Sequence, residues 1–172
     1  VFTPDNSELP VNGGMSIAID KKDNIWLAQY TYLGVSSLVK LSNNAWTVYT
    51  DQELGFTPVW WGNIEVNSKG QVCGAINYTY SDMAHNPRPQ AIIFDGVTCK
   101  HLQFDDSSIV QSLIVDNDDN VWCKNKNGFA VYNGSSWVID SLTFKDIRLE
   151  TIELSKDNTI WIGTENGIYI ND

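Results

Sequence analysis

The chain has 172 residues, a length that suits one domain and can bury a sizeable core. Its 11 basic and 21 acidic side chains give a net charge of −10, which argues against nucleic acid and anionic membranes as partners. No apolar run approaches the roughly 18 residues of a membrane-spanning helix, so no membrane-inserted segment is expected. Because the sequence begins at Val1 without Met and in the middle of a pattern, we expect a processed or trimmed piece.

Taken in chain order, the sequence repeats one short pattern four times. Each copy reads as an apolar residue, then Asp, Asn or Ser, then a polar turn, then an apolar residue before Trp or Cys. The anchor positions are Trp26, Cys73, Trp122 and Trp161, separated by 47, 49 and 39 residues. This spacing is close to the roughly 40–50 residues of propeller repeats, and each turn predicts a hairpin.

Further alternating segments follow each anchor. A third strand is predicted in all four copies, at Ser36–Leu41, Ala91–Asp95, Phe129–Asn133 and Ile168–Asn171. A fourth strand is predicted in the first three copies, at Ala45–Thr50, Val97–Leu102 and Ser136–Ile139. No stretch shows sustained helical periodicity. The sequence therefore predicts an all-β fold, a β-propeller made of about four four-stranded antiparallel blades.

The last copy lacks a fourth strand. The first residues, Val1–Thr3, resemble the end of the fourth-strand pattern in Trp46–Thr50, so they would close a small ring by completing the last blade. The alternative is a fragment of a larger propeller. We therefore predict one domain over residues 1–172, with blades near 14–50, 62–104, 111–140, and 150–172 plus 1–3.

The repeat resembles the two-component regulator propeller repeat of sensory ectodomains in bacterial hybrid histidine kinases, notably from gut Bacteroidetes. The segment Asp157–Ile168 matches the family pattern well, and Asp119–Trp122 and Asp23–Trp26 match it fairly. The second copy departs most, with Cys73 in place of Trp. The resemblance implies a binding role in the periplasm or outside the cell, and it supplies no catalytic residues.

Aromatic residues gather on one predicted face of the blades. In four antiparallel strands, the loops between second and third strands share a face with the connections between blades. Three segments therefore supply a candidate ligand site: the loop Tyr30–Tyr32, the connection Gly55–Gly62, and the loop from Tyr78 to Pro89. Its residues are Tyr30, Tyr32, Trp60, Trp61, Tyr78, Tyr80, His85 and Arg88. Such rings suit stacking on sugars or aromatic ligands. The alternative is that Trp60 or Trp61 fills the core between blades while the tyrosines pack locally.

Other chemistry-bearing residues have structural interpretations. The acidic segment Asp116–Asn120 lacks the glycine and downstream glutamate of a calcium loop, so we predict an Asx-rich turn and no metal site. The odd set Cys73, Cys99 and Cys123 is interpreted as buried small hydrophobes. The two histidines, His85 and His101, belong to no catalytic motif, and we predict no catalytic residue and no cofactor.

These patterns together predict an extracytoplasmic ligand-binding or sensory propeller module, with a small molecule or an oligosaccharide fragment as its ligand. One alternative is a protein-interaction or structural propeller that self-associates as a homo-oligomer. A second alternative is a carbohydrate-active enzyme.

Overall fold

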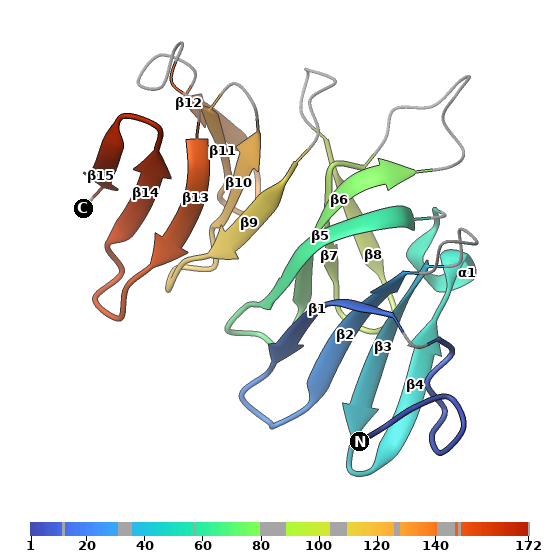
Figure 1. The fold of residues 1–172 in the computed structure, drawn as a ribbon. Helices are drawn as coiled ribbons and strands as arrows, with labels where there is room; N and C mark the ends of the chain where they lie inside the picture. The colour runs from blue at the N-terminus through green and yellow to red at the C-terminus, as the bar shows by residue number, and fades with distance from the viewer. Residues whose placement is uncertain are drawn as a thin grey trace.

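The computed structural model describes residues 1–11, 13–30, 36–56, 58–79, 89–103, 110–125, 128–140, 147 and 149–171. These residues form four antiparallel sheets and one turn of helix (Figure 1). The first sheet contains β1 (Gly14–Ile19), β2 (Ile25–Tyr30), β3 (Ser36–Ser42) and β4 (Ala45–Tyr49). The second contains β5 (Pro58–Val66), β6 (Val72–Thr79), β7 (Ala91–Phe94) and β8 (Cys99–Leu102). The third contains β9 (Ser112–Val115), β10 (Val121–Asn125), β11 (Gly128–Tyr132) and β12 (Trp137–Asp140). The fourth contains β13 (Leu149–Leu154), β14 (Ile160–Thr164) and β15 (Gly167–Asn171).

Each sheet pairs its strands in sequence order, so every sheet is an up-and-down meander. The first strand of each sheet lies against the first strand of the next, through contacts of β1 with β5, β5 with β9, and β9 with β13. Figure 1 shows the first sheet in blue and the fourth in red at opposite ends of the arrangement. Repeated four-stranded sheets joined through their innermost strands are the architecture of a β-propeller, which confirms the predicted fold class.

The four anchor residues occupy one repeated position in the ladders. Trp26 lies between Ala18 and Lys40, and Trp161 lies between Glu153 and Ile170. Cys73 and Trp122 have the equivalent partners in the second and third sheets. The spacing of the anchors in the sequence therefore correctly predicts the register of the second strand in every sheet.

The polar turns between first and second strands also share one geometry. Their third turn residue is left-handed in all four copies, with φ of 59° at Asp23, 78° at Gly70, 64° at Asp119 and 71° at Asn158. Aspartate, asparagine and glycine tolerate this conformation best, which explains the composition of the turns. In the first turn, the carboxylate of Asp20 accepts hydrogen bonds from the backbone N–H groups of Lys22 and Asn24, at 2.8 and 2.9 Å.

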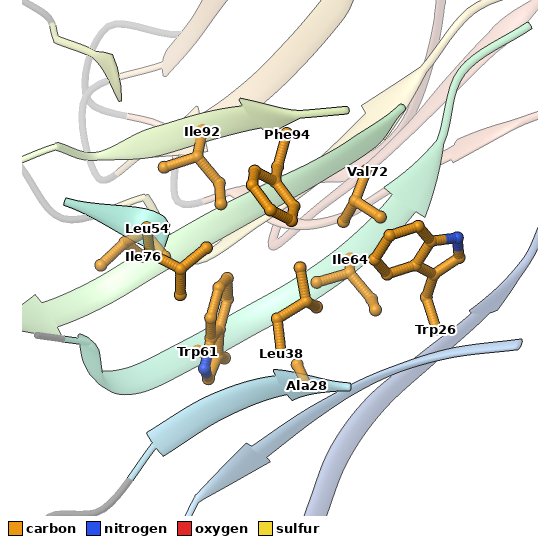
Figure 2. Close-up of a cluster of buried hydrophobic side chains, with 10 residues drawn as sticks. All are labelled: Trp26, Ala28, Leu38, Leu54, Trp61, Ile64, Val72, Ile76, Ile92 and Phe94. Atoms are coloured by element: carbon orange, nitrogen blue, oxygen red, sulfur yellow. The ribbon is translucent and has the colours of Figure 1, made fainter. Parts of the chain in front are cut away.

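Apolar side chains fill the spaces between neighbouring sheets. Figure 2 shows the cluster between the first and second sheets, in which Trp26 points across to Phe94 and Val72. The Trp26 ring stacks on Tyr49 at 5.8 Å and meets Phe94 edge-on at 6.4 Å. Burying such a ring contributes about 2–3 kcal/mol. A second cluster around Cys73 and Cys123 joins the second and third sheets, and a third cluster joins the third and fourth.

A short helix, α1 (Asp51–Leu54), follows the first sheet and was not predicted. A single turn is too short to produce a periodic apolar pattern. The sequence nevertheless contains a signal for the start of this helix, because Thr50 and Glu53 form a capping box. In it, the Thr50 N–H donates to Glu53 Oε2 at 2.8 Å. Gly55 ends the helix in a left-handed conformation, with φ of 75°.

Residues 1–3 lie outside any strand and against the first sheet. The Phe2 ring meets Trp46 of β4 edge-on at 5.3 Å. The fourth sheet therefore has three strands in this structure, and Val1–Thr3 do not complete it. The local resemblance to a fourth strand was misleading because an apolar side chain such as Phe2 can contact the nearest sheet without pairing as a strand.

Candidate functional site

The predicted aromatic face is described in part. Tyr30, Trp60 and Trp61 are described with their side chains, and Tyr78 is placed in β6 as the ladder partner of Trp60. The remaining predicted site residues, Tyr32, Tyr80, His85 and Arg88, lie outside the described residues.

Tyr30 and Trp60 form a stacked pair across the boundary between two sheets. Tyr30 is the last residue of β2, and Trp60 belongs to β5 of the second sheet. Their ring centroids are 5.1 Å apart with an interplanar angle of 27°, and Trp60 remains 45% exposed. Offset stacking of this kind holds an aromatic side chain in a fixed orientation at a modest gain in free energy. The pair is therefore a preformed aromatic platform with one ring open to solvent.

Trp61 lies on the other side of the same strand and is completely buried. It belongs to the cluster between the first and second sheets, as Figure 2 shows. A Cβ at Gly74 would approach the Trp61 ring to 2.9 Å, so glycine at this position leaves room for the indole. Trp61 therefore has no access to a ligand, and its inclusion in the predicted site is corrected to a core position.

The strand that carries both tryptophans is irregular, which the sequence did not predict. The segment Gly55–Gly62 was predicted as a connection, but β5 begins at Pro58, inside that segment. Its pairing with β6 shifts register between Pro58 and Trp60, between Trp60 and Trp61, and between Trp61 and Ile64. Bulges of this kind twist a strand and redirect its side chains. The irregular ladder thus presents Trp60 to solvent beside a fully buried neighbour.

A second aromatic contact lies where the chain enters β5. The ring of Phe56 meets His101 edge-on at 5.2 Å. The His101 Nε2 atom lies 2.8 Å from the Leu54 carbonyl oxygen, at the end of α1. A carbonyl can only accept, so the Nε2 atom carries the proton in this contact. His101 lies in β8, as predicted, and the hydrogen bond gives it a role in holding the helix end against the sheet.

Polar side chains in the interfaces tie neighbouring sheets together, and sequence reasoning overlooked them. Asn63 of β5 donates from Nδ2 to the Leu113 carbonyl at 2.7 Å and accepts from the Leu113 N–H at 2.8 Å. Lys124 is buried and donates from Nζ to the Glu150 carbonyl at 3.0 Å. The available signal was a polar residue at a position where the strand pattern requires an inward-facing side chain.

The acidic turns on the opposite face are occupied by internal hydrogen bonds. Asp116 Oδ1 accepts from the N–H groups of Asp118 and Asn120, and Oδ2 accepts from Asn120 Nδ2 and from Trp122 Nε1 at 2.9 Å. This pattern supports the predicted Asx-rich turn. In the described part of the chain, no group of three or more histidine, cysteine or acidic side chains is arranged to hold a metal ion.

Burial decides the protonation of the cysteines and modifies that of the turn carboxylates. Burial raises the pKa of the Cys73 and Cys99 thiols to about 12, and all three cysteines are unpaired. Burial also raises the pKa of Asp20, but hydrogen bonds from Asn24 and Lys22 outweigh this and lower it overall. Neither type of group is poised to exchange protons near neutral pH.

Among the described residues, no helix has the length and apolarity required to cross a membrane. No family model and no curated protein matches the sequence.

The fold is similar to several solved propeller structures. The extracellular domain of a hybrid two component system from B. thetaiotaomicron is 17% identical with a TM-score of 0.69, over 98% of this chain and 23% of that one. PorZ, a surface component of the type-IX secretion system of Porphyromonas gingivalis, is 16% identical with a TM-score of 0.64, over 90% and 25%. An inactive virginiamycin B lyase from Staphylococcus aureus, solved with quinupristin, is 15% identical with a TM-score of 0.67, over 92% and 55%.

This chain therefore spans about a quarter of the first two proteins and about half of the third. At these identities the likeness establishes the propeller fold.

Proposed function

We propose that this chain is a ligand-binding β-propeller module of an extracytoplasmic sensory protein, and that it recognises a glycan fragment. The observation that carries the proposal is the stacked pair of Tyr30 and Trp60, with Trp60 45% exposed. The extracytoplasmic location is supported by the fold shared with an extracellular sensor domain and a bacterial surface protein.

Sugar rings present apolar C–H faces that pack on an aromatic ring, while their hydroxyls need polar partners around it. Trp60 offers such a ring, and Tyr30 fixes its orientation before a ligand arrives. Preorganisation of this kind reduces the entropy lost on binding. The polar partners in this proposal are the hydroxyls of Tyr32, Tyr78 and Tyr80 together with His85 and Arg88, from the loops that the sequence places on the same face.

The test is a glycan array with the labelled chain, followed by calorimetric titration of the saccharides that bind. We expect Trp60→Ala to weaken binding at least tenfold, equivalent to about 1.4 kcal/mol. Tyr30→Ala should weaken it less, because it removes the support of the platform and not the platform itself. Tyr169→Ala, a partly exposed tyrosine in the fourth sheet, is the matched control and should leave binding unchanged. Saccharide binding that survives both Trp60→Ala and Tyr30→Ala would refute the site, and failure to bind any saccharide would refute the ligand class.

A further inference from the structure

The three interfaces between successive sheets are built from equivalent residues. Each sheet presents its anchor position towards the next sheet, as Trp26, Cys73 and Trp122 do. Each following sheet presents an apolar residue of its first strand in return, and these residues are Ile64, Leu113 and Ile152. All three returning residues are buried. Every internal interface therefore joins a leading face, which carries the anchor, to a trailing face, which carries the inner-strand residue.

The fourth sheet has a leading face that no described residue covers. Its anchor, Trp161, is 42% exposed, whereas Trp26 at the equivalent position is 1% exposed. Ile170 is the ladder partner of Trp161 and is also exposed, as is Ile168 two positions before it on β15. These side chains lie on one face because partners across a ladder share a face and alternate residues do so along a strand.

The first sheet has a trailing face that is bare in the same way. Ile17 occupies the ladder position equivalent to Ile64, yet Ile17 is 62% exposed and Ile64 is 2% exposed. Ile19 lies on the same side of β1 and is exposed as well. Large apolar side chains gathered on one face are typical of an interaction surface. The chain thus has one uncovered leading face, on the fourth sheet, and one uncovered trailing face, on the first sheet.

The polar turns show the same spare pair. The Ser68 N–H and hydroxyl donate to the Asp119 carboxylate, both at 2.7 Å, and the Asn117 N–H donates to Asn158 Oδ1 at 2.8 Å. In each case the donor lies five residues before the anchor of its own sheet. The acceptor is the left-handed Asp or Asn that lies three residues before the anchor of the next sheet. The Lys156 N–H is the equivalent donor in the fourth sheet, and the Asp23 carboxylate is the equivalent acceptor in the first. Neither has a partner among the described residues.

We propose that the leading face around Trp161 docks onto the trailing face around Ile17 of a second copy of this chain. The contact continues an interface that the chain already uses three times, and Lys156 and Asp23 supply opposite charges at the turn that joins the sheets. Asp157, beside Lys156, is held within its own turn by Ser155 and Thr159. The interface is head-to-tail, and two copies would bring together eight sheets, within the usual range of propeller sizes.

The test is the molar mass of the 172-residue chain by sedimentation and light scattering over a concentration series. We expect a dimer that dissociates on dilution, and we expect Trp161→Glu and Ile17→Glu each to be monomeric. Both side chains are substantially exposed, so folding should survive, which circular dichroism checks. Val97→Glu adds a charge at an exposed apolar residue away from both faces and should still dimerise.

A mixture of the two monomeric variants gives the sharpest result. Trp161→Glu keeps its trailing face and Ile17→Glu keeps its leading face, so the mixture should recover a one-to-one dimer. Asp23→Lys should weaken dimerisation of the otherwise unchanged chain. A wild-type chain that stays monomeric would overturn the proposal. Further blades, and not a second copy, would then be the expected cover of the two faces. Dimers in either single variant, or no recovery in the mixture, would also overturn it. Saccharide binding is measured separately and does not depend on this outcome.

Discussion

Two adjacent tryptophans should lose very different amounts of stability when each is replaced by alanine. Trp61 is completely buried between two sheets, whereas Trp60 is stacked on Tyr30 at the surface. Replacing a buried tryptophan by alanine removes transfer free energy and leaves a cavity, a loss of about 3–5 kcal/mol. Replacing Trp60 removes one exposed stacking contact, a loss of about 0.5–1.5 kcal/mol.

The assay is urea unfolding followed by far-ultraviolet circular dichroism. With a urea dependence of about 2 kcal/mol per molar, Trp61→Ala should lower the midpoint by about 1.5–2.5 M. Trp60→Ala should lower it by only about 0.25–0.75 M. The two variants differ by one position in the sequence and share the same change in side chain, so each is the other's control.

Trp61→Phe refines the comparison. The Trp61 indole N–H is buried and has no hydrogen-bond partner among the described residues. An unpaired buried donor costs about 1–3 kcal/mol, so phenylalanine should recover much of the loss seen with alanine. Equal midpoints for Trp60→Ala and Trp61→Ala would refute the assignment of one residue to the surface and the other to the core.

Three further predictions concern the turns, the thiols and a half-buried carboxylate. Asp119→Ala should lower the free energy of unfolding by about 1 kcal/mol, because it removes an acceptor for Ser68, and Asp119→Asn should lose less. Burial raises the pKa of Asp119, but the hydrogen bonds from Ser68 lower it below its ordinary 3.8, so this stabilisation is present above that pH and lost as acid titration passes the folded-state value. Ellman's reagent at pH 8 should leave Cys73 unmodified in the folded chain and react with all three cysteines in denaturant, since burial raises the Cys73 pKa to about 12. Burial and then the charge of Glu153 raise the pKa of Glu65 above 4.5, so its ionised form opposes folding at neutral pH. Glu65→Gln should therefore raise the urea midpoint at pH 7, and the gain should disappear below about pH 4; a lower midpoint at pH 7 would contradict this account.

The sheets could be predicted from the sequence because each is specified locally. The alternation of apolar and polar residues gives the strands, and left-handed turn residues such as Asp119 and Asn158 mark where they reverse. The repeated anchors then place the strands in register. The turn of helix at Asp51–Leu54 and the early start of β5 were missed because they depend on a single capping box and on bulges without a periodic pattern.

The site was harder to predict, because exposure is decided by what packs against a strand and not by the strand itself. Sequence reasoning placed Trp60 and Trp61 together, although a strand sends neighbouring side chains to opposite faces. The alternative that one tryptophan fills the core is confirmed for Trp61. Tyr30 and Trp60 were correctly placed near each other, since the ends of two antiparallel strands meet at the same edge of neighbouring sheets.

The dependence of exposure on neighbouring sheets also explains why Trp26 is buried and Trp161 is exposed. Both occur in the same motif and hold the same position in the ladder, so the sequence alone predicts packing between blades for both. Trp26 is covered by the second sheet, whereas the described residues leave Trp161 open. A motif therefore fixes the direction in which a side chain points, and only a neighbouring sheet makes that side chain part of a core. For this reason the exposed copy of a repeated core residue is evidence about a missing neighbour, and the mixed-variant experiment asks directly whether that neighbour is a second copy of the chain.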